Sequence, residues 1–247
     1  HNYITVLMNI INACHLINHT DEIFEYLTKI RSIPQKSLIS KREYLDVKVF
    51  ADTINIELAL DIVKGEFKKG MLLIPEIDAR FEEFGGKMNK YQESVLYFNL
   101  SVICFGAGEY SFALKWLNTL LNDKDIEMMQ ELYCFSKILN LIIHFEIGND
   151  ELLPDIVRST HRFLEQRKKL YRFESIFLVF IKKISNYPDE KDLKKFYSEL
   201  KTELEQLAQD PFERRAFDYF DFISWTDSKI KKIPFAEIVQ AKVRNEK

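Results

Sequence analysis

Apolar residues recur along this chain at steps of three and four, the spacing that places them on one face of an α-helix. The pattern is clear over residues 7–17, 97–105, 173–184 and 193–207. Glycine and proline number only 7 and 6 in 247 residues, well below average usage. Since few turn residues imply short connections and long elements, the pattern predicts an all-α protein and excludes a β-sandwich.

One segment, 97–120, has the most complete pattern of a helix pair. Large apolar residues occupy one face of a first helix, Gly108 follows as its C-terminal cap, and a second helix opens with Tyr110 and Ala113. A small side chain at Ala113 allows the two helix backbones to approach each other where they cross. The positions that define the unit are Tyr97, Leu100, Ser101, Cys104, Gly108, Tyr110, Ala113, Leu117 and Leu120.

The same offsets recur on both sides of this unit. One copy consists of Gly65, Phe67, Gly70, Ile74 and Ile77. A degenerate copy begins at Gly148, where Asp150 replaces the aromatic residue and Leu153 the small one. The three cap glycines are thus 43 and 40 residues apart, which predicts a repeating helix pair.

This unit resembles the tetratricopeptide (TPR) signature, in which the same residue types stand at the same offsets, and the chain is similar to divergent bacterial members of that family. Its steps exceed the TPR period of about 34 residues, which implies longer helices. The resemblance implies one domain over residues 1–247, an α-α superhelix of about five antiparallel helix pairs plus a C-terminal capping helix. We expect it to be the C-terminal part of a longer protein, because the helical pattern is already running at Tyr3.

Local signals predict the remaining elements. Residues 7–17 and 21–31 form a first pair, and Pro75 predicts a kink or a late helix start. A helix is expected from about 151 to 172 and another over 173–184. The boundary between them, within 164–173, follows from the repeat period, because no turn residue marks it. Asp210 and Pro211 predict the start of a terminal helix through Trp225, and residues 232–244 a final short helix after Pro234.

Charge and length exclude several classes of partner. The net charge of −3 and the pI near 6.0 leave no excess of cations for phosphates, so direct nucleic-acid binding is not expected. The longest uncharged run, 94–108, is too short to span a membrane. Three cysteines lie in apolar helical patterns, which favours free thiols and a cytoplasmic location. No particular oligomeric state is favoured.

The residues typical of catalysis and metal binding are scarce. Gly106 and Gly108 have no third glycine at the dinucleotide spacing and follow no strand. Cys14, His15 and His19 lack an acidic ligand nearby, and His144 sits in an apolar helix where a packed, hydrogen-bonded histidine is expected. We therefore predict a protein that is not an enzyme and has no metal site and no cofactor.

Two surfaces are candidates for binding. In TPR proteins the first helices line the inner wall, and this implies exposed positions here at Phe98, Asn99, Val102, Phe105, Ile138, Ile142 and Phe145. Only Asn99 and Asn55 suit the clamp with which chaperone-binding TPR domains hold a terminal carboxylate. The mostly apolar wall instead predicts a bound peptide or helix, or coverage by an upstream segment of the protein itself.

The second surface is a basic stripe on the helix expected at 151–172. A step of about 100° per residue aligns Arg158, His161, Arg162, Lys169 and Arg172, interrupted by Glu165. The stripe fits an acidic or phosphorylated segment, or a solvated convex face without a ligand. Both surfaces favour a non-catalytic protein-protein interaction or scaffolding module. The alternative is a peptide-sensing domain of a transcription regulator, which requires a DNA-binding domain before His1.

Overall fold

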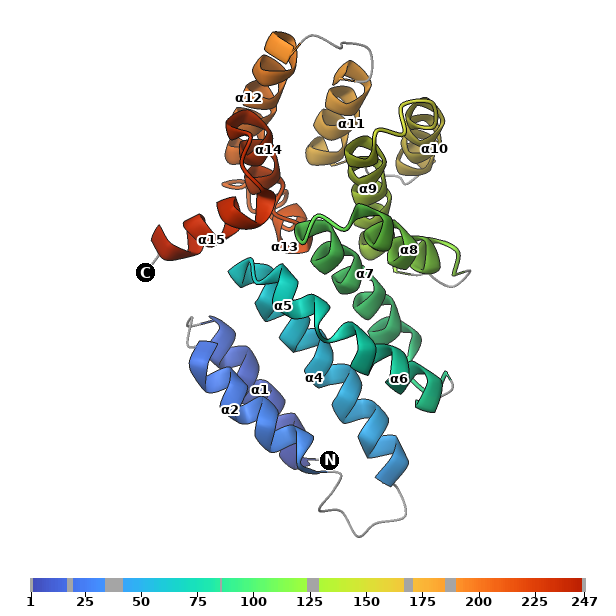
Figure 1. The fold of residues 1–247 in the computed structure, drawn as a ribbon, viewed down its shortest axis with the longest axis vertical. Coiled ribbons are helices and arrows are strands. Elements are labelled where there is room, and N and C mark those ends of the chain that lie inside the picture. The colour runs from blue at the N-terminus through green and yellow to red at the C-terminus, as the bar shows by residue number, and fades with distance from the viewer. Residues whose placement is uncertain are drawn as a thin grey trace.

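The computed structural model describes residues 2–16, 20–33, 42–84, 86–123, 129–166, 171–184 and 190–245. Within these ranges every regular element is a helix and no strand occurs (Figure 1). The prediction of an all-α protein is confirmed. None of the helices in these ranges combines the length and the apolar character needed to cross a membrane.

The helices have the following bounds. The first half contains α1 (Asn2–Leu16), α2 (Thr20–Arg31), α4 (Arg42–Lys64), α5 (Phe67–Met71), α6 (Ile74–Phe84), α7 (Lys90–Gly106) and α8 (Tyr110–Leu121). The second half contains α9 (Gln130–Ile147), α10 (Leu153–Gln166), α11 (Arg172–Ile184), α12 (Glu190–Leu207), α13 (Ala216–Tyr219), α14 (Phe222–Lys231) and α15 (Phe235–Asn245). Most helices pack against their neighbours in sequence, which gives the elongated array in Figure 1.

Three helix ends share one backbone geometry. Gly65, Gly108 and Gly148 have φ angles of 69°, 83° and 77°, in the left-handed region that favours glycine. In each case the following amide donates to the carbonyl five residues earlier, over distances of 2.8, 2.9 and 3.0 Å. This pattern is the Schellman motif. The three predicted caps are therefore confirmed.

These caps allow a matched pair of substitutions. We expect Gly148→Ala to lower the free energy of unfolding by about 1 kcal/mol, because an L residue is strained at this φ while its Cβ would have open space. Gly65→Ala should cost more, because its Cβ would lie 3.0 Å from Cγ of Gln240 and 3.1 Å from the carbonyl oxygen of Ala236. Urea denaturation followed by circular dichroism measures both losses. Equal losses would contradict the contact of α15 with this turn.

The α7 and α8 helices approach closely where the sequence predicts a small residue. Ala113 is fully buried, and its carbonyl accepts a hydrogen bond of 3.0 Å from the hydroxyl of Ser101 on α7. A larger side chain at position 113 would separate the backbones that this bond joins. The proposed mechanical role of Ala113 is thus supported by a direct contact.

Helix α4 is buried on two sides and joins the two apolar cores. Val49 and Leu60 pack with α1 and α2 in a small cluster. Ile54 and Leu58 face the main cluster, which extends through the rest of the molecule. The shared helix α4 therefore attaches the N-terminal pair to the array, and Lys69 on α5 adds a contact with the Phe24 ring on α2 at 5.1 Å.

The region of Pro75 matches its prediction. Helix α5 ends at Met71, and α6 begins at Ile74 with Pro75 in its first turn, where the missing amide hydrogen costs no helical hydrogen bond. The final helix after Pro234 is also confirmed, as α15.

Two predicted helices are wrong. The expected helix from Asp210 to Trp225 is replaced by turns, the short α13 and α14, and the carboxylate of Asp210 accepts the amide of Phe212 at 2.8 Å, as in an Asx turn. The helix expected from about 151 to 172 ends earlier, at Gln166, while the next helix starts at Arg172, close to the expected boundary. Two carboxylates cap the start of α11. The distant Glu213 accepts the amides of Arg172 and Phe173 at 3.0 and 3.1 Å, and the local Glu174 accepts the amide of Tyr171 at 3.1 Å.

The C-terminal helices return to the first half of the molecule. Helix α15 packs on α4, Gln240 donates through Nε2 to the carbonyl of Gly65 at 2.8 Å, and Phe235 stacks on Phe67 at 5.4 Å. Figure 1 shows α13 and α15 between the lower helices and α12 and α14 above. The segment after α12 thus contacts the first half of the molecule as well as the end of the array.

Candidate binding cleft beside the C-terminal helices

The inner wall expected from the TPR resemblance is mostly inside the protein. Asn99 and Phe145 are half-buried. The other five residues are at most 4% exposed: Phe98, Val102, Phe105, Ile138 and Ile142. The expectation that these side chains are exposed is wrong.

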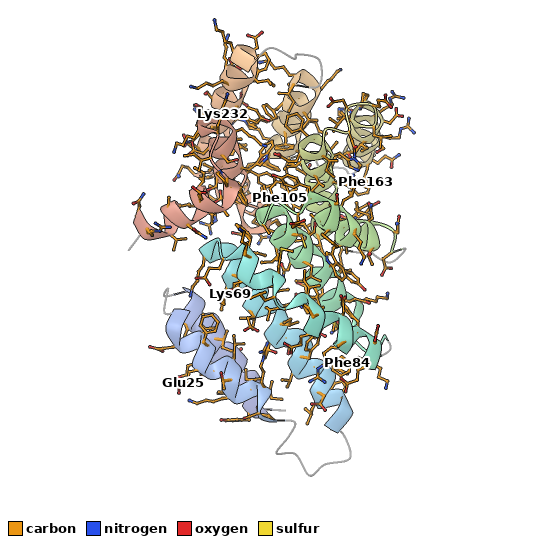
Figure 2. The ribbon with its side chains drawn as sticks, in the orientation of Figure 1. Glu25, Lys69, Phe84, Phe105, Phe163 and Lys232 are labelled. Atoms are coloured by element: carbon orange, nitrogen blue, oxygen red, sulfur yellow. The ribbon has the colours of Figure 1, made fainter. Side chains whose placement is uncertain are left out.

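The C-terminal segment explains this burial. The ring of Tyr219 lies edge-on to Phe98 and stacks on Phe135 at 4.2 Å. Phe220 and Phe235 contact Phe105 at ring distances of 5.2 and 5.7 Å, and Figure 2 shows Phe105 near the centre of the molecule. Phe98 and Phe105 of this wall are therefore covered by a downstream segment of the same chain, where coverage by an upstream segment was one of the expectations.

The two asparagines that suit a carboxylate clamp bond to each other. Asn99 donates through Nδ2 to Oδ1 of Asn55 at 3.1 Å, and Asn55 donates to the carbonyl of Gln92 at 3.2 Å. These bonds join α4 to α7. Asn55 and Asn99 therefore hold α4 against α7.

The basic stripe is divided between two helices. Arg158 pairs with Asp155 at 3.2 Å and His161 with Glu165 at 3.1 Å, all exposed on α10, and Arg162 is also exposed there. Arg172 is the first residue of α11, while Lys169 lies outside the described residues. The structure therefore does not place the five side chains on a single helix face.

The cysteine and histidine positions with candidate chemistry are packed or hydrogen-bonded. The buried Cys14 thiol donates to Glu22 at 3.7 Å, whereas the His15 side chain and His19 lie outside what the structure describes. Burial lowers the pKa of His144, and its Nδ1 lies 3.0 Å from Nδ2 of Asn149. This hydrogen bond confirms that His144 is a packed histidine. Within the described ranges, no three His, Cys, Asp or Glu side chains are grouped to hold a metal.

A buried carboxylate that the sequence analysis missed lies at the end of α9. The side chain of Glu146 is only 6% exposed and forms a salt bridge with Lys229 on α14. It also accepts a hydrogen bond of 2.7 Å from the indole nitrogen of Trp225. On α8, burial and then Glu146 raise the pKa of Tyr110 to about 12. Glu146 thus joins three helices through polar contacts.

Beside Glu146 is an open cleft of about 620 Å³, which we call the lysine cleft. It lies between the end of α9, the start of α12 and the end of α14. The described residues that line it are Phe145, Lys191, Leu193, Lys194, Tyr197, Lys229, Ile230, Lys231 and Lys232. Five are lysines, and none of them is acidic.

Carboxylates behind the lining hold two of these lysines. Glu146 pairs with Lys229, and Asp227 pairs with Lys231 at 2.6 Å. Burial acts to raise the pKa of Asp227, but hydrogen bonds from Lys201 and Lys231 outweigh it, so this pKa is lowered. Both ammonium groups are therefore held in place at the cleft by salt bridges.

The lysine cleft also has apolar and aromatic lining residues. Phe145, Leu193 and Ile230 are half-buried and give it an apolar surface. Tyr197 is 5% exposed, and its hydroxyl has no hydrogen-bond partner within the described structure. A smaller cavity of about 310 Å³ adjoins the cleft, sharing Lys229 and Lys232, and Figure 2 marks Lys232.

Comparisons with protein-family models, curated proteins and solved structures found no match. The description of the lysine cleft therefore rests on its lining residues alone. One signal for it is visible in sequence, the run Lys229-Ile230-Lys231-Lys232 before Pro234. Its proximity to Lys191 and Lys194 on α12 follows only from the packing of α12 against α14.

Proposed function

We propose that this chain is a TPR-like helical-repeat protein that binds a segment of another protein and has no catalytic role. The main support is the recurrence of one helix-pair turn, with the same Schellman geometry at Gly65, Gly108 and Gly148. Successive helices pack on their neighbours, as in solenoids, where extended surfaces are left for partners.

The state of the titratable side chains supports a non-catalytic role. Burial raises the pKa of the Cys104 thiol to about 12, which disfavours the reactive thiolate. His144 is engaged by Asn149, and Glu146 by Trp225 and Lys229. Three buried free thiols also fit a reducing compartment, and we propose the cytoplasm.

The proposed binding surface differs from the usual inner wall of a TPR protein. Phe98 and Phe105 contact the protein's own C-terminal segment, so this wall is occupied. The lysine cleft remains open, and its volume of about 620 Å³ lies within the range of common binding pockets. We therefore propose that the partner binds on the side formed by α9, α12 and α14.

Affinity capture followed by solution binding tests the proposal. Proteins captured from a lysate on the immobilised chain would each be purified and titrated by calorimetry. We expect at least one saturable complex, with amide hydrogen exchange slowed on α12 and α14. Absence of saturable binding by every captured protein would contradict the interaction module, whereas protection confined to other helices would contradict only the proposed surface.

A further inference from the structure

The lysine cleft is lined by basic side chains, whereas the protein as a whole has a negative net charge. Five ammonium groups line it without a carboxylate among the described lining residues, although the chain has a net charge of −3. The carboxylates of Glu146 and Asp227, which pair with Lys229 and Lys231, are not among these lining residues. Such a concentration of one charge attracts a ligand of opposite charge.

We propose that the lysine cleft binds an acidic peptide segment of a partner protein, with aspartate or glutamate side chains at the lysines and an apolar side chain against Phe145, Leu193 and Ile230. This inference rests on the proposed function and specifies the chemistry of the partner.

The apolar surface of the cleft favours a peptide over a small inorganic anion. Phe145, Leu193 and Ile230 retain partial exposure, and covering them stabilises a complex by about 25 cal/mol for each Å² removed from water. An inorganic anion has no group that covers them. A peptide supplies carboxylates and apolar side chains within a few residues.

The type of cation favours carboxylates over phosphates. All five cationic side chains of the cleft are lysines and none is arginine. Arginine, with its planar fork of donors, is the residue enriched where bidentate phosphate recognition matters, whereas lysine acts as a compact point charge. The negative charge of the remaining protein also opposes a long polyanion such as RNA, whose binding depends on many cation contacts.

Salt bridges hold two of the lysines in position before a ligand binds. Glu146 is nearly buried and contacts both Trp225 and Lys229, and Asp227 is held by Lys201 at 2.7 Å as well as by Lys231. These contacts fix α14 against α9 and α12. Because the positions of Lys229 and Lys231 are already set, less side-chain entropy is lost when a ligand binds.

The test uses fluorescein-labelled peptides selected from a library of short sequences in which aspartate or glutamate alternates with apolar residues. Binding is followed by fluorescence anisotropy at low and at high salt. We expect saturable binding of the selected peptide, at least about tenfold weaker at high salt, and loss of binding when its acidic residues are replaced by asparagine and glutamine.

Charge reversal locates the site. Lys194→Glu is expected to weaken the selected peptide at least about tenfold, and Lys191→Glu with Lys194→Glu to weaken it further. Lys195→Glu is the matched control, because Lys195 is the next residue on α12, has a side chain 69% exposed and does not line the cleft. This control should change the affinity less than about twofold, and all variants should keep the wild-type circular dichroism spectrum.

Several outcomes would overturn the inference. These are failure of every acidic peptide to bind, equal weakening by Lys195→Glu and Lys194→Glu, and displacement of the peptide by inorganic phosphate or a single-stranded oligonucleotide at lower concentration than by unlabelled peptide. A partner that binds the intact protein with hydrogen-exchange protection elsewhere would leave the proposed function standing while rejecting the acidic segment.

Discussion

Gly106→Ala is expected to lower the free energy of unfolding by about 2 to 3 kcal/mol, although alanine is ordinarily the better residue inside a helix. A Cβ atom at position 106 would lie 2.3 Å from two atoms of the Phe67 ring. That ring is 1% exposed and stacks on Phe235, so it has little room to move. Urea denaturation followed by circular dichroism gives the change.

Making the same substitution in a protein that also carries Phe67→Ala distinguishes the clash with the ring from the intrinsic helix preference of alanine. In a protein carrying Phe67→Ala, the ring is absent, and Gly106→Ala should be neutral or stabilising because only the helix preference of alanine remains. An equal loss in both backgrounds would show that the ring does not press on α7. The same result would remove the physical reason for a glycine at this position.

Glu146→Ala should have a comparable effect, a loss of about 3 kcal/mol. The substitution removes the carboxylate that serves Lys229 and the indole of Trp225, and a buried donor left without an acceptor is costly. Removal of one partner of a buried ion pair costs about 3 to 5 kcal/mol, and the partial exposure of Lys229, at 28%, places this site at the lower end. Urea denaturation again measures the loss.

Two variants calibrate this result. Glu146→Gln keeps an acceptor for Trp225 but loses the charge that faces Lys229, so we expect an intermediate loss. Glu203→Ala, at an exposed position of α12, should change stability by less than about 0.5 kcal/mol. A Glu146→Ala loss no larger than that of Glu203→Ala would mean that the contacts of Glu146 do not hold α14 in place.

The sequence by itself determined the features that depend on neighbouring residues. The glycine caps at Gly65, Gly108 and Gly148 were predictable because glycine is the residue that adopts a left-handed backbone with the least strain. Pro75 and Pro234 indicated helix starts for a similarly local reason. The small residue at Ala113 and the packed state of His144 also followed from position within a helical pattern.

The tertiary structure decided which elements contact each other. An apolar helix face predicts burial but does not identify what covers it, so Phe98 and Phe105 were expected at an open wall and lie beneath α13 and α15. The helix start at Arg172 depends on a carboxylate at Glu213, about forty residues downstream, as well as on the local acceptor Glu174, and no turn residue marks it. The lysine cleft has the same origin, since Lys194 and Lys231 come together only because α12 packs on α14. Contacts between residues far apart in sequence are selected by the fit of complete surfaces, and that fit exists only once the chain is folded.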